Sequence, residues 1–370
     1  MRIGINTRSL LGSKMEGFGN YTLELVTRIC KSHPEHTFYL YFDRPVSEQF
    51  SFPSNAVCRS VFPPTRHPLL YIWWFQFSLK RNLKKDQVDL FWSPDGMLPL
   101  GLKIPTLASV HDLNFEHFPK DLPWVVSKYY RYFFPKFARL ATKIVTVSQT
   151  TKDDIKACYK IEDAKIAVIY NGVNPAYQAL NTTQKIKTIA HLKLPESYFL
   201  FVGSLHPRKN IKRLLAAFQV FANNDTNTDL VIVGSAMWDA QKFQIQEQYK
   251  NRIHFLGHIE TDKLAQIMAC ATAFVYIPYF EGFGMPLAEA MATETPILAG
   301  NQSCLPEIAA DAALYVDPYN TDDIAQGMQQ LKNDVALQTA LKQKGLERVK
   351  AFDWDHAAVQ LWHEIENLVS

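Results

Sequence analysis

The sequence predicts an α/β protein with two similar halves, each built on a doubly wound parallel sheet. Short apolar runs with the length of buried strands alternate with segments that have helical spacing. The chain has 370 residues, and single cores stop growing near ~250–300 residues, so two domains are expected. Ligands of such sheets bind at the carboxyl ends of the strands.

The first half contains seven strand-like runs. The first covers residues 2–7 and leads through a glycine-containing loop, Gly12 to Gly19, into a helical pattern from Tyr21 to Lys31. The later strands are expected at residues 37–43, 56–61, 89–92, 106–110, 144–147 and 166–170.

A polar segment that ends near residue 196 separates the halves and is predicted as a weakly structured linker, least globular at 181–185. We expect an N-terminal domain at 1–174 and a C-terminal domain at 175–353. An amphipathic helix at 354–370 is expected to return to the first domain. In the second half, strands are expected at 198–203, 229–234, 252–256, 273–277, 296–299 and 313–316, and helices near 210–222, 239–250, 262–271 and 285–293.

Composition excludes several classes of protein. The 39 basic and 36 acidic residues give a net charge of +3, which gives no reason to expect nucleic acid as a partner. Five scattered cysteines without a C-x-x-C pair indicate free thiols in a reducing compartment. The start lacks the apolar core of a signal peptide, and no apolar run approaches ~18 residues, so the expected localisation is cytoplasmic, soluble or peripheral.

The stretch from residue 276 to residue 289 reads as a strand, a glycine turn and a helix opened by Met285 and Pro286. A helix start offers unpaired N–H groups and a partial positive charge, which suit an anion or a polarised hydroxyl. Glu281 would face that point, and Glu289 would aim a carboxylate at a pair of hydroxyls. The alternative is that both are ordinary solvated carboxylates.

A second strand end carries a basic pair, Arg208 and Lys209, at the start of a helix. Two full charges added to the field of the helix start favour a diphosphate as ligand. The alternative is a pair of solvated surface cations.

The loop before the first helix holds Gly17 and Gly19, with Asp43 at the end of the next strand. Thr22 stands where a dinucleotide fingerprint has its third glycine, and the loop is too long for that fingerprint's tight turn. A flexible loop that contacts a substrate fits better.

His111 directly follows another predicted strand, at 106–110. There it would hydrogen-bond to a sugar or receive a proton; the alternative is a structural histidine.

Three pairs of acids are predicted to serve helix starts. Asp353 and Asp355 begin the terminal helix, where a capping role is favoured over a metal pair. Asp153 with Asp154, and likewise the pair at 322–323, are predicted as first-turn acids. No His/Cys/carboxylate cluster has metal spacing, so no metal is expected.

Two stretches, 68–85 and 124–143, mix aromatic and basic residues. Such side chains suit a membrane headgroup interface. Helices that pack one face on the sheet with Lys and Arg outward are the favoured interpretation.

These motifs together resemble the GT4 family of retaining nucleotide-sugar glycosyltransferases, which have the GT-B fold of two facing Rossmann-like domains with parallel sheets. The matching motifs cover the whole chain in the family's order, and they look most like the bacterial branch of O-antigen mannosyltransferases that use GDP-mannose. The motifs are Gly-Phe-Gly-Asn-Tyr at 17–21, Val-His-Asp at 110–112, Thr-Val-Ser at 146–148, Asn-Gly-Val at 171–173, Pro-Arg-Lys-Asn at 207–210 and Glu-x7-Glu at 281–289.

The resemblance implies roles for the candidate residues. Catalytic roles fall to the side chains that would contact the diphosphate or the transferred sugar: Arg208 and Lys209 at the diphosphate, Glu281 at the donor sugar, and His111 near the transferred sugar. Donor-binding roles fall to Glu289 at the ribose, Phe283, Gly284 and Met285 along the sugar and phosphate, Phe255 and Leu256 at the base, and Gly17 and Gly19 near the phosphate. Ser204 departs from the pattern, since many members have arginine there, and it leaves more of the charge to the basic pair.

The reaction implied is metal-independent hexosyl transfer that retains anomeric configuration and needs no enzyme nucleophile or cofactor. The implied partners are a nucleotide-sugar donor and a glycan or lipid-linked saccharide acceptor, with a peripheral contact at the inner membrane surface as a further expectation. Alternatives are an epimerase or sugar-phosphate synthase of the same fold, or a non-catalytic sugar-nucleotide-binding protein.

Overall fold

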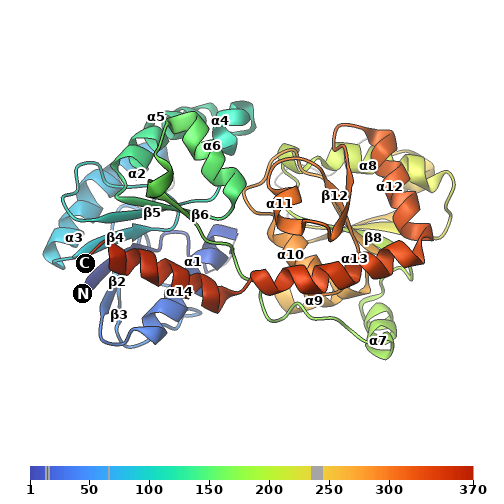
Figure 1. The fold of residues 1–370 in the computed structure, drawn as a ribbon, viewed down its shortest axis with the longest axis horizontal. Coiled ribbons are helices and arrows are strands. Elements are labelled where there is room, and N and C mark those ends of the chain that lie inside the picture. The colour runs from blue at the N-terminus through green and yellow to red at the C-terminus, as the bar shows by residue number, and fades with distance from the viewer. Residues whose placement is uncertain (13–14, 16, 66, 235–244, 370) are drawn as a thin grey trace. The chain divides into compact units, whose positions relative to one another are not determined.

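A computed structural model describes the chain except for residues 13–14, 16, 66, 235–244 and 370. It divides into two compact units, which are described separately (Figure 1). Unit 1 comprises Met1–Gly172 and Asp353–Ser370, and unit 2 comprises Val173–Phe352. Each unit has one parallel sheet with helices around it, as the sequence predicts.

Unit 1 contains a seven-stranded sheet in the order β3-β2-β1-β4-β5-β6-β7. The strands are β1 (Arg2–Asn6), β2 (Thr37–Phe42), β3 (Ala56–Ser60), β4 (Leu90–Ser93), β5 (Thr106–Val110), β6 (Lys143–Thr146) and β7 (Ile166–Val168). The helices are α1 (Gly17–Ser32), α2 (Pro68–Trp73), which continues through a π-helical turn (Trp74–Leu79) into α3 (Lys80–Lys85), α4 (Asn114–His117), α5 (Trp124–Leu140), α6 (Gln149–Tyr159) and α14 (Trp354–Asn367).

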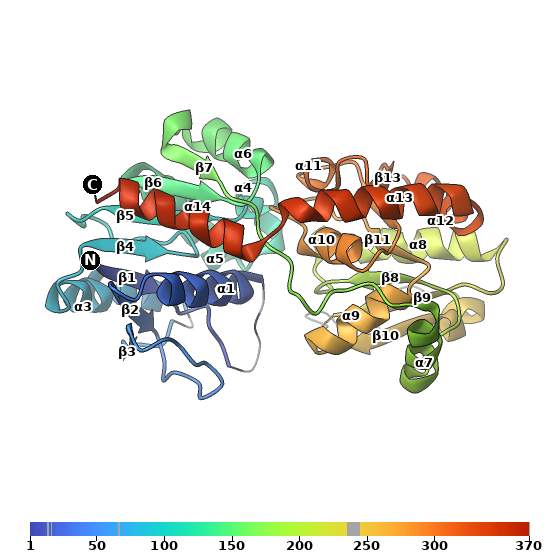
Figure 2. The same ribbon diagram turned by 60° about the horizontal axis from the view of Figure 1, so that its bottom comes forward.

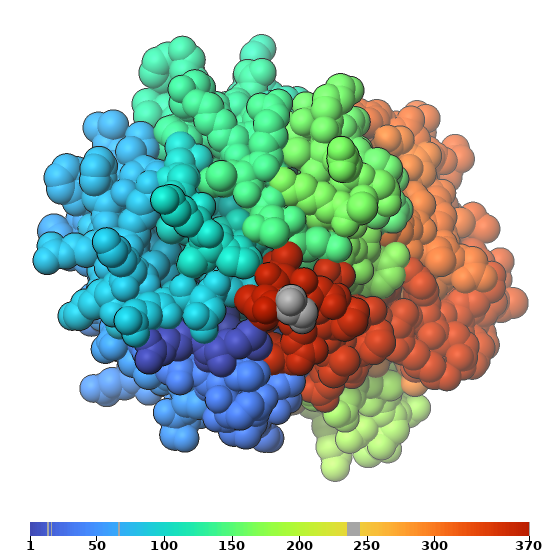
Figure 3. All heavy atoms as spheres, turned by 60° about the vertical axis from the view of Figure 1, so that its left-hand side comes forward, coloured from blue at the N-terminus to red at the C-terminus, as the bar shows by residue number. Residues whose placement is uncertain are grey.

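The terminal helix α14 packs beside α1 in unit 1, as the sequence predicts (Figure 2). Asp353 caps it by accepting a hydrogen bond from the backbone N–H of His356 at 2.7 Å, which confirms the capping role. Asp355 binds Arg28 of α1 at 2.6 Å. A Cβ on Gly172 would lie 2.2 Å from the backbone nitrogen of Trp354, so only glycine permits this approach. Figure 3 shows the red end of α14 at the surface beside the blue first residues of the chain.

Unit 2 contains a six-stranded sheet in the order β10-β9-β8-β11-β12-β13. The strands are β8 (Tyr198–Val202), β9 (Asp229–Val233), β10 (Ile253–Gly257), β11 (Ala273–Tyr276), β12 (Ile297–Gly300) and β13 (Ala313–Val316). The helices are α7 (Thr182–Leu192), α8 (Ile211–Ala222), α9 (Thr261–Cys270), α10 (Met285–Ala292), α11 (Leu305–Ala309), α12 (Thr321–Asn333) and α13 (Val335–Arg348).

The cores lie along the strands, whose bounds fall within two residues of the predicted ones. Every residue of β8 is buried, as expected of a parallel strand covered on both faces. The first half of the helix predicted at 239–250 lies outside the described residues. The prediction is wrong for the described half, which has no α-helix and ends in a 3₁₀ turn, Glu247–Arg252. Among the described residues, no helix combines the length and apolar character needed to cross a membrane.

The structure corrects three local predictions. The linker prediction is wrong at 181–185, because Asn181 and Gln184 form a reciprocal capping box that starts α7. Helix α1 begins at Gly17 instead of Tyr21, so both glycines lie in a helical turn and not in the loop. Asp153 and Asp154 do not lie in the first turn of α6, because Ser148 caps that helix and places the first turn at 149–151.

Candidate active site

The basic pair of unit 2 lies in a short 3₁₀ turn, Pro207–Lys209, between β8 and α8. Asn210 ends this turn in the left-handed conformation, with φ of 62°. Its amide donates to the carbonyl oxygens of Ile277 at 3.1 Å and Pro318 at 2.7 Å. These bonds fix the turn to two other strand ends, so the side chains of Arg208 and Lys209 start from a rigid base.

Lys209, Glu281 and Tyr276 form a buried cluster at this turn. The ammonium of Lys209 lies 2.5 Å from a carboxylate oxygen of Glu281 and donates to the Tyr276 hydroxyl oxygen at 2.7 Å. Arg208 lies 3.6 Å from the same carboxylate. Lys209 and Glu281 are each only 8% exposed. Both predicted charges are therefore buried partners, and neither is a solvated surface group.

The charges of the cluster set the protonation of Glu281. Burial acts to raise the pKa of this carboxyl, but the positive charges of Lys209 and Arg208 outweigh it, so the pKa lies below its ordinary value. The carboxyl is thus ionised at neutral pH. Two cations and one anion leave a local charge of +1, which suits an anionic ligand.

The glycine turn that carries Glu281 is held from both sides. The backbone N–H of Glu281 donates to the Ser303 hydroxyl at 3.1 Å, and that hydroxyl donates to the backbone carbonyl of Glu281 at 2.6 Å. Tyr279 N–H donates to the Arg208 carbonyl at 2.8 Å. The turn is thereby joined to the basic pair through the backbone.

Helix α10 begins where the sequence predicts, after the glycine turn. Gly284 has φ of 80° in the left-handed region, which a residue with a Cβ adopts only with strain. Pro286 lies in the first turn, where its missing N–H removes an unpaired donor. Phe283 is buried against Phe352, with ring centroids 5.4 Å apart, and Met285 is half-buried.

Glu289 lies on α10 and is hydrogen-bonded to the hydroxyl of Tyr177. Burial raises the pKa of this carboxyl to about 7. At neutral pH the carboxyl is therefore partly protonated and partly ionised. Tyr177 was not predicted, because it lies 112 positions before its partner and a lone tyrosine carries no motif.

Three glycines lie at neighbouring strand ends of unit 2. Gly203 N–H donates to Val233 O at 2.9 Å, and Gly234 N–H donates to Gly257 O at 2.8 Å. A Cβ on Gly234 would lie 1.9 Å from the Gly203 carbonyl oxygen. No side chain therefore projects from these three positions of the carboxyl edge. Beside them, Ser204 and Phe255 are half-buried and Leu256 is exposed.

In unit 1, His111 is enclosed by aromatic rings at the end of β5. Its Nε2–H donates to the carbonyl oxygen of Pro94 at 2.8 Å. The rings of Phe18 and Tyr21 lie 4.6 and 4.5 Å from the imidazole. Burial lowers the pKa of His111, so the ring is neutral at pH 7 and Nδ1 carries the lone pair.

The glycine pair that flanks Phe18 differs in its surroundings. A Cβ on Gly19 would lie 3.0 Å from the carbonyl oxygen of Ser9, whereas a Cβ on Gly17 would meet nothing within 4 Å. Close packing thus explains why position 19 is glycine but does not explain the glycine at position 17.

Asp43, the acid of the dinucleotide alternative, is 2% exposed and binds Arg44 and Thr65, so it does not face a ribose.

The aromatic and basic stretches of unit 1 form an exposed surface over α2 and α5. Tyr129 and Phe137 pack inward, as the favoured interpretation expects. Five large apolar side chains nevertheless remain more than half exposed, namely Leu69, Trp73, Phe77, Trp124 and Tyr132. Lys128 lies over the Trp124 ring at 4.2 Å, and Lys136 over the Tyr132 ring at 3.4 Å. A groove of about 540 Å³ runs between these helices.

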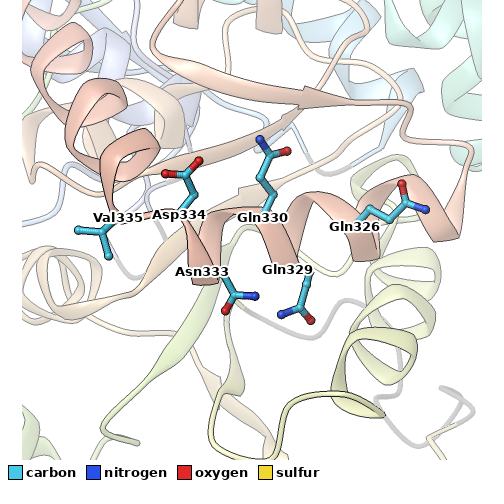
Figure 4. A pocket seen from close by; sticks show the side chains of 6 residues that line it. All are labelled: Gln326, Gln329, Gln330, Asn333, Asp334 and Val335. Carbon is cyan, nitrogen blue, oxygen red and sulfur yellow. The ribbon is translucent and has the colours of Figure 1, made fainter.

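A further hollow in unit 2 lies along α12 and the start of α13 (Figure 4). Its lining consists of amide side chains with Val335 and one carboxylate, Asp334. That carboxylate caps α13 by accepting from Leu337 N–H at 2.8 Å. The hollow therefore holds no group placed for chemistry.

Comparison with known proteins finds two family models, one on each half of the chain. "Glycosyltransferase Family 4" matches residues 15–177, and "Glycosyl transferases group 1" matches residues 183–348. The chain is 26% identical to O-antigen chain mannosyltransferase B of Escherichia coli, over 94% of each chain. It is 27% identical to O-antigen chain mannosyltransferase RfbU of Salmonella typhimurium, over 94% of this chain and 95% of that one.

Solved structures match the fold over almost the whole chain. Sucrose-phosphate synthase from Thermosynechococcus elongatus superposes with a TM-score of 0.82 at 20% identity, covering 99% of this chain and 98% of that one. Anabaena HepE in complex with UDP-glucose superposes with a TM-score of 0.76 at 16% identity, covering 99% and 100%. These likenesses establish the GT-B fold.

Proposed function

The chain belongs to glycosyltransferase family 4 and is a glycosyltransferase, and from this premise we propose that it moves a hexose from a nucleotide sugar with retention of anomeric configuration. The donor proposed is GDP-mannose, and the acceptor a glycan or lipid-linked saccharide in surface polysaccharide synthesis. The O-antigen mannosyltransferases that resemble the chain over 94% of its length support this choice.

The buried cluster of Lys209, Arg208 and Glu281 is the observation that carries the proposal. Cleavage of a sugar–diphosphate bond leaves negative charge on the diphosphate and positive character on the sugar ring. Preorganised cations stabilise that leaving group, and one such donor is commonly worth ~3–4 kcal/mol in the transition state. Glu281 lies next to these cations, where its carboxylate would accept hydrogen bonds from the donor sugar.

The other residues have supporting roles in this reaction. Glu289 would hold the ribose hydroxyls, with Tyr177 fixing the carboxylate. The glycine-lined strand ends would let the phosphates and the base approach the backbone. His111 would orient a hydroxyl through Nδ1, because Nε2–H is already bound to Pro94. The acceptor attacks the face from which the diphosphate leaves, and an oxygen of the leaving group takes the acceptor's proton, so the proposed route needs no metal or cofactor.

Nucleotide binding and product analysis test the proposal together. GDP, UDP, ADP and their sugars are compared by thermal shift, since a ligand of the folded state raises the apparent stability in proportion to its affinity. The ligand that binds is then tested for turnover, the anomeric configuration of the product is read by NMR, and the assay is repeated with EDTA. A free epimerised sugar or a sugar phosphate as product would favour the alternative enzymes. Binding without turnover would favour a non-catalytic protein. Inversion of configuration, or a requirement for added Mg²⁺ or Mn²⁺ after EDTA treatment, would refute the mechanism.

We further propose that unit 1 contacts the cytoplasmic membrane surface through the face over α2 and α5. Exposed aromatic rings interleaved with Lys128 and Lys136 suit an interface with anionic headgroups.

Sedimentation with vesicles tests this contact. The protein should sediment with anionic vesicles and should not sediment with neutral ones. The variant Trp124→Ser should weaken retention, whereas Val359→Ser on α14, an exposed apolar residue of the same unit, should not. Equal retention of both variants would contradict the assignment.

A further inference from the structure

Three side chains with metal-binding atoms meet where α4 contacts α6 in unit 1. His117 comes from α4, and Asp154 and Cys158 are four residues apart on one face of α6. One ligand atom of each residue lies within 4.8 Å of the other two. Among the described residues, this group meets the geometric condition for holding an ion. None of the three belongs to the proposed donor or acceptor machinery.

The spacing of these atoms is close to that of a tetrahedral zinc site. His117 Nε2 lies 2.8 Å from one Asp154 oxygen and 2.9 Å from the other. Cys158 Sγ lies 3.4 Å from Asp154 Oδ1. Zinc bond lengths of about 2.0–2.1 Å to N and O and 2.3 Å to S place N and O about 3.3 Å apart and S and O about 3.6 Å apart. An ion would therefore enter with shifts of a few tenths of an ångström along these two edges.

The surroundings hold the group in place and add negative charge. Glu116, next to His117, accepts from Tyr159 O–H at 3.0 Å and from Arg131 Nε at 3.1 Å, which ties α4 to α6 and α5. Its carboxylate also interacts electrostatically with Cys158. These bonds position the backbone that carries His117, because Glu116 is its neighbour in the chain. The carboxylates of Asp154 and Glu116 contribute negative charge here, which Arg131 partly offsets at Glu116.

We propose that His117, Asp154 and Cys158 bind a zinc-type transition-metal ion, with solvent completing the coordination. A thiolate together with an imidazole selects Zn²⁺ or Co²⁺ over Mg²⁺ and Ca²⁺, which prefer oxygen ligands alone. His117 is 39% exposed and Asp154 is 14% exposed, so water reaches the fourth position. This proposal is independent of the reaction proposed above, because none of the three residues is assigned to the donor or to the transferred sugar.

Metal binding would exchange hydrogen bonds for coordinate bonds. The imidazole coordinates through Nε2 with its proton on Nδ1, and the Cys158 thiol releases one proton to solvent as it becomes a thiolate. The ion would join α4 to α6 just after the segment that carries His111. Thr151 of α6 already donates to the His111 carbonyl at 3.2 Å. The metal would thus add a second connection between α6 and that segment.

Calorimetric titration of the full chain with ZnCl₂ under reducing conditions tests the proposal. We expect one ion per chain and release of about one proton, read from the dependence of the heat on the buffer. His117→Ala and Cys158→Ser should each raise the Kd at least tenfold, by analogy with the ~10–100-fold effect of outer-shell changes. The matched controls are His258→Ala and Cys58→Ser, an exposed histidine and an exposed cysteine elsewhere in the chain, and both should bind as the unsubstituted protein does.

The Co²⁺ spectrum gives a second readout, which already tests the coordination in the unsubstituted protein. The unsubstituted protein should show the intense visible bands of tetrahedral cobalt and a thiolate-to-cobalt charge-transfer band, and Cys158→Ser should lose the latter. Weak octahedral bands without charge transfer would overturn the proposal. Zinc binding that persists unchanged in His117→Ala and Cys158→Ser, or that is lost in the control variants, would also overturn it.

Discussion

The raised pKa of Glu289 makes the stability of unit 2 fall as pH rises. A carboxyl whose pKa is lowered on folding has the opposite effect. Its pKa is about 7 in the folded protein, against about 4.3 in an unfolded chain. Between these values the folded state holds a proton that the unfolded state has lost. Stability therefore falls as pH rises from about 4.3, and the loss levels off once the pH has passed the folded-state pKa of about 7.

The magnitude follows from the size of the shift. A difference of between two and three pKa units corresponds to about 3–4 kcal/mol, and partial exposure of Glu289 to solvent makes this an upper value. Glu289→Gln keeps the shape and a hydrogen-bond acceptor for Tyr177 but does not ionise. The variant should match the unsubstituted protein near pH 4.5 and exceed it increasingly up to pH 8.

Denaturant unfolding of both proteins at several pH values between 5 and 8 measures this difference. The subtraction cancels the other ionisable groups, because they are common to the two proteins. Gln219→Glu, which places a carboxyl at another buried site of unit 2, would show how large such a slope becomes for a carboxyl that accepts from a backbone N–H, that of Gln246. If the difference between Glu289→Gln and the unsubstituted protein is constant from pH 5 to 8, the reasoning about Glu289 is refuted.

The remaining predictions concern the buried cluster and the start of α10. Lys209→Ala should lower kcat by about 10²–10³-fold, whereas Lys212→Ala, an exposed lysine on the next helix, should leave kcat within twofold; equal loss in both would contradict the assignment. Glu281→Gln should lower turnover while thermal shift still detects nucleotide binding, and full turnover would remove its role at the donor sugar. Gly284→Ala should lower stability by about 1–2 kcal/mol, because alanine is strained at φ of 80°; an unchanged melting temperature would show that the turn relaxes freely.

Local patterns in the sequence predicted the elements and some of the contacts made within them. Apolar runs gave the strands of both sheets to within two residues, and the order Gly-Met-Pro predicted the start of α10, since each signal acts within one turn or one strand. Asn181 and Gln184 also carried a readable signal, three residues apart, but the polar composition around them suggested a linker instead.

The chain by itself thus determined the two α/β halves and the identity of the side chains at the strand ends, because periodicity, capping and turn chemistry are short-range effects. Only the tertiary structure decided which of those side chains meet. Lys209 and Glu281 lie 72 positions apart, Tyr177 and Glu289 lie 112 apart, and His117 lies 37 positions before Asp154. Burial and pairing at such separations depend on how sheets and helices pack, and no local pattern encodes the pKa of Glu289 or the meeting of His117 with Cys158.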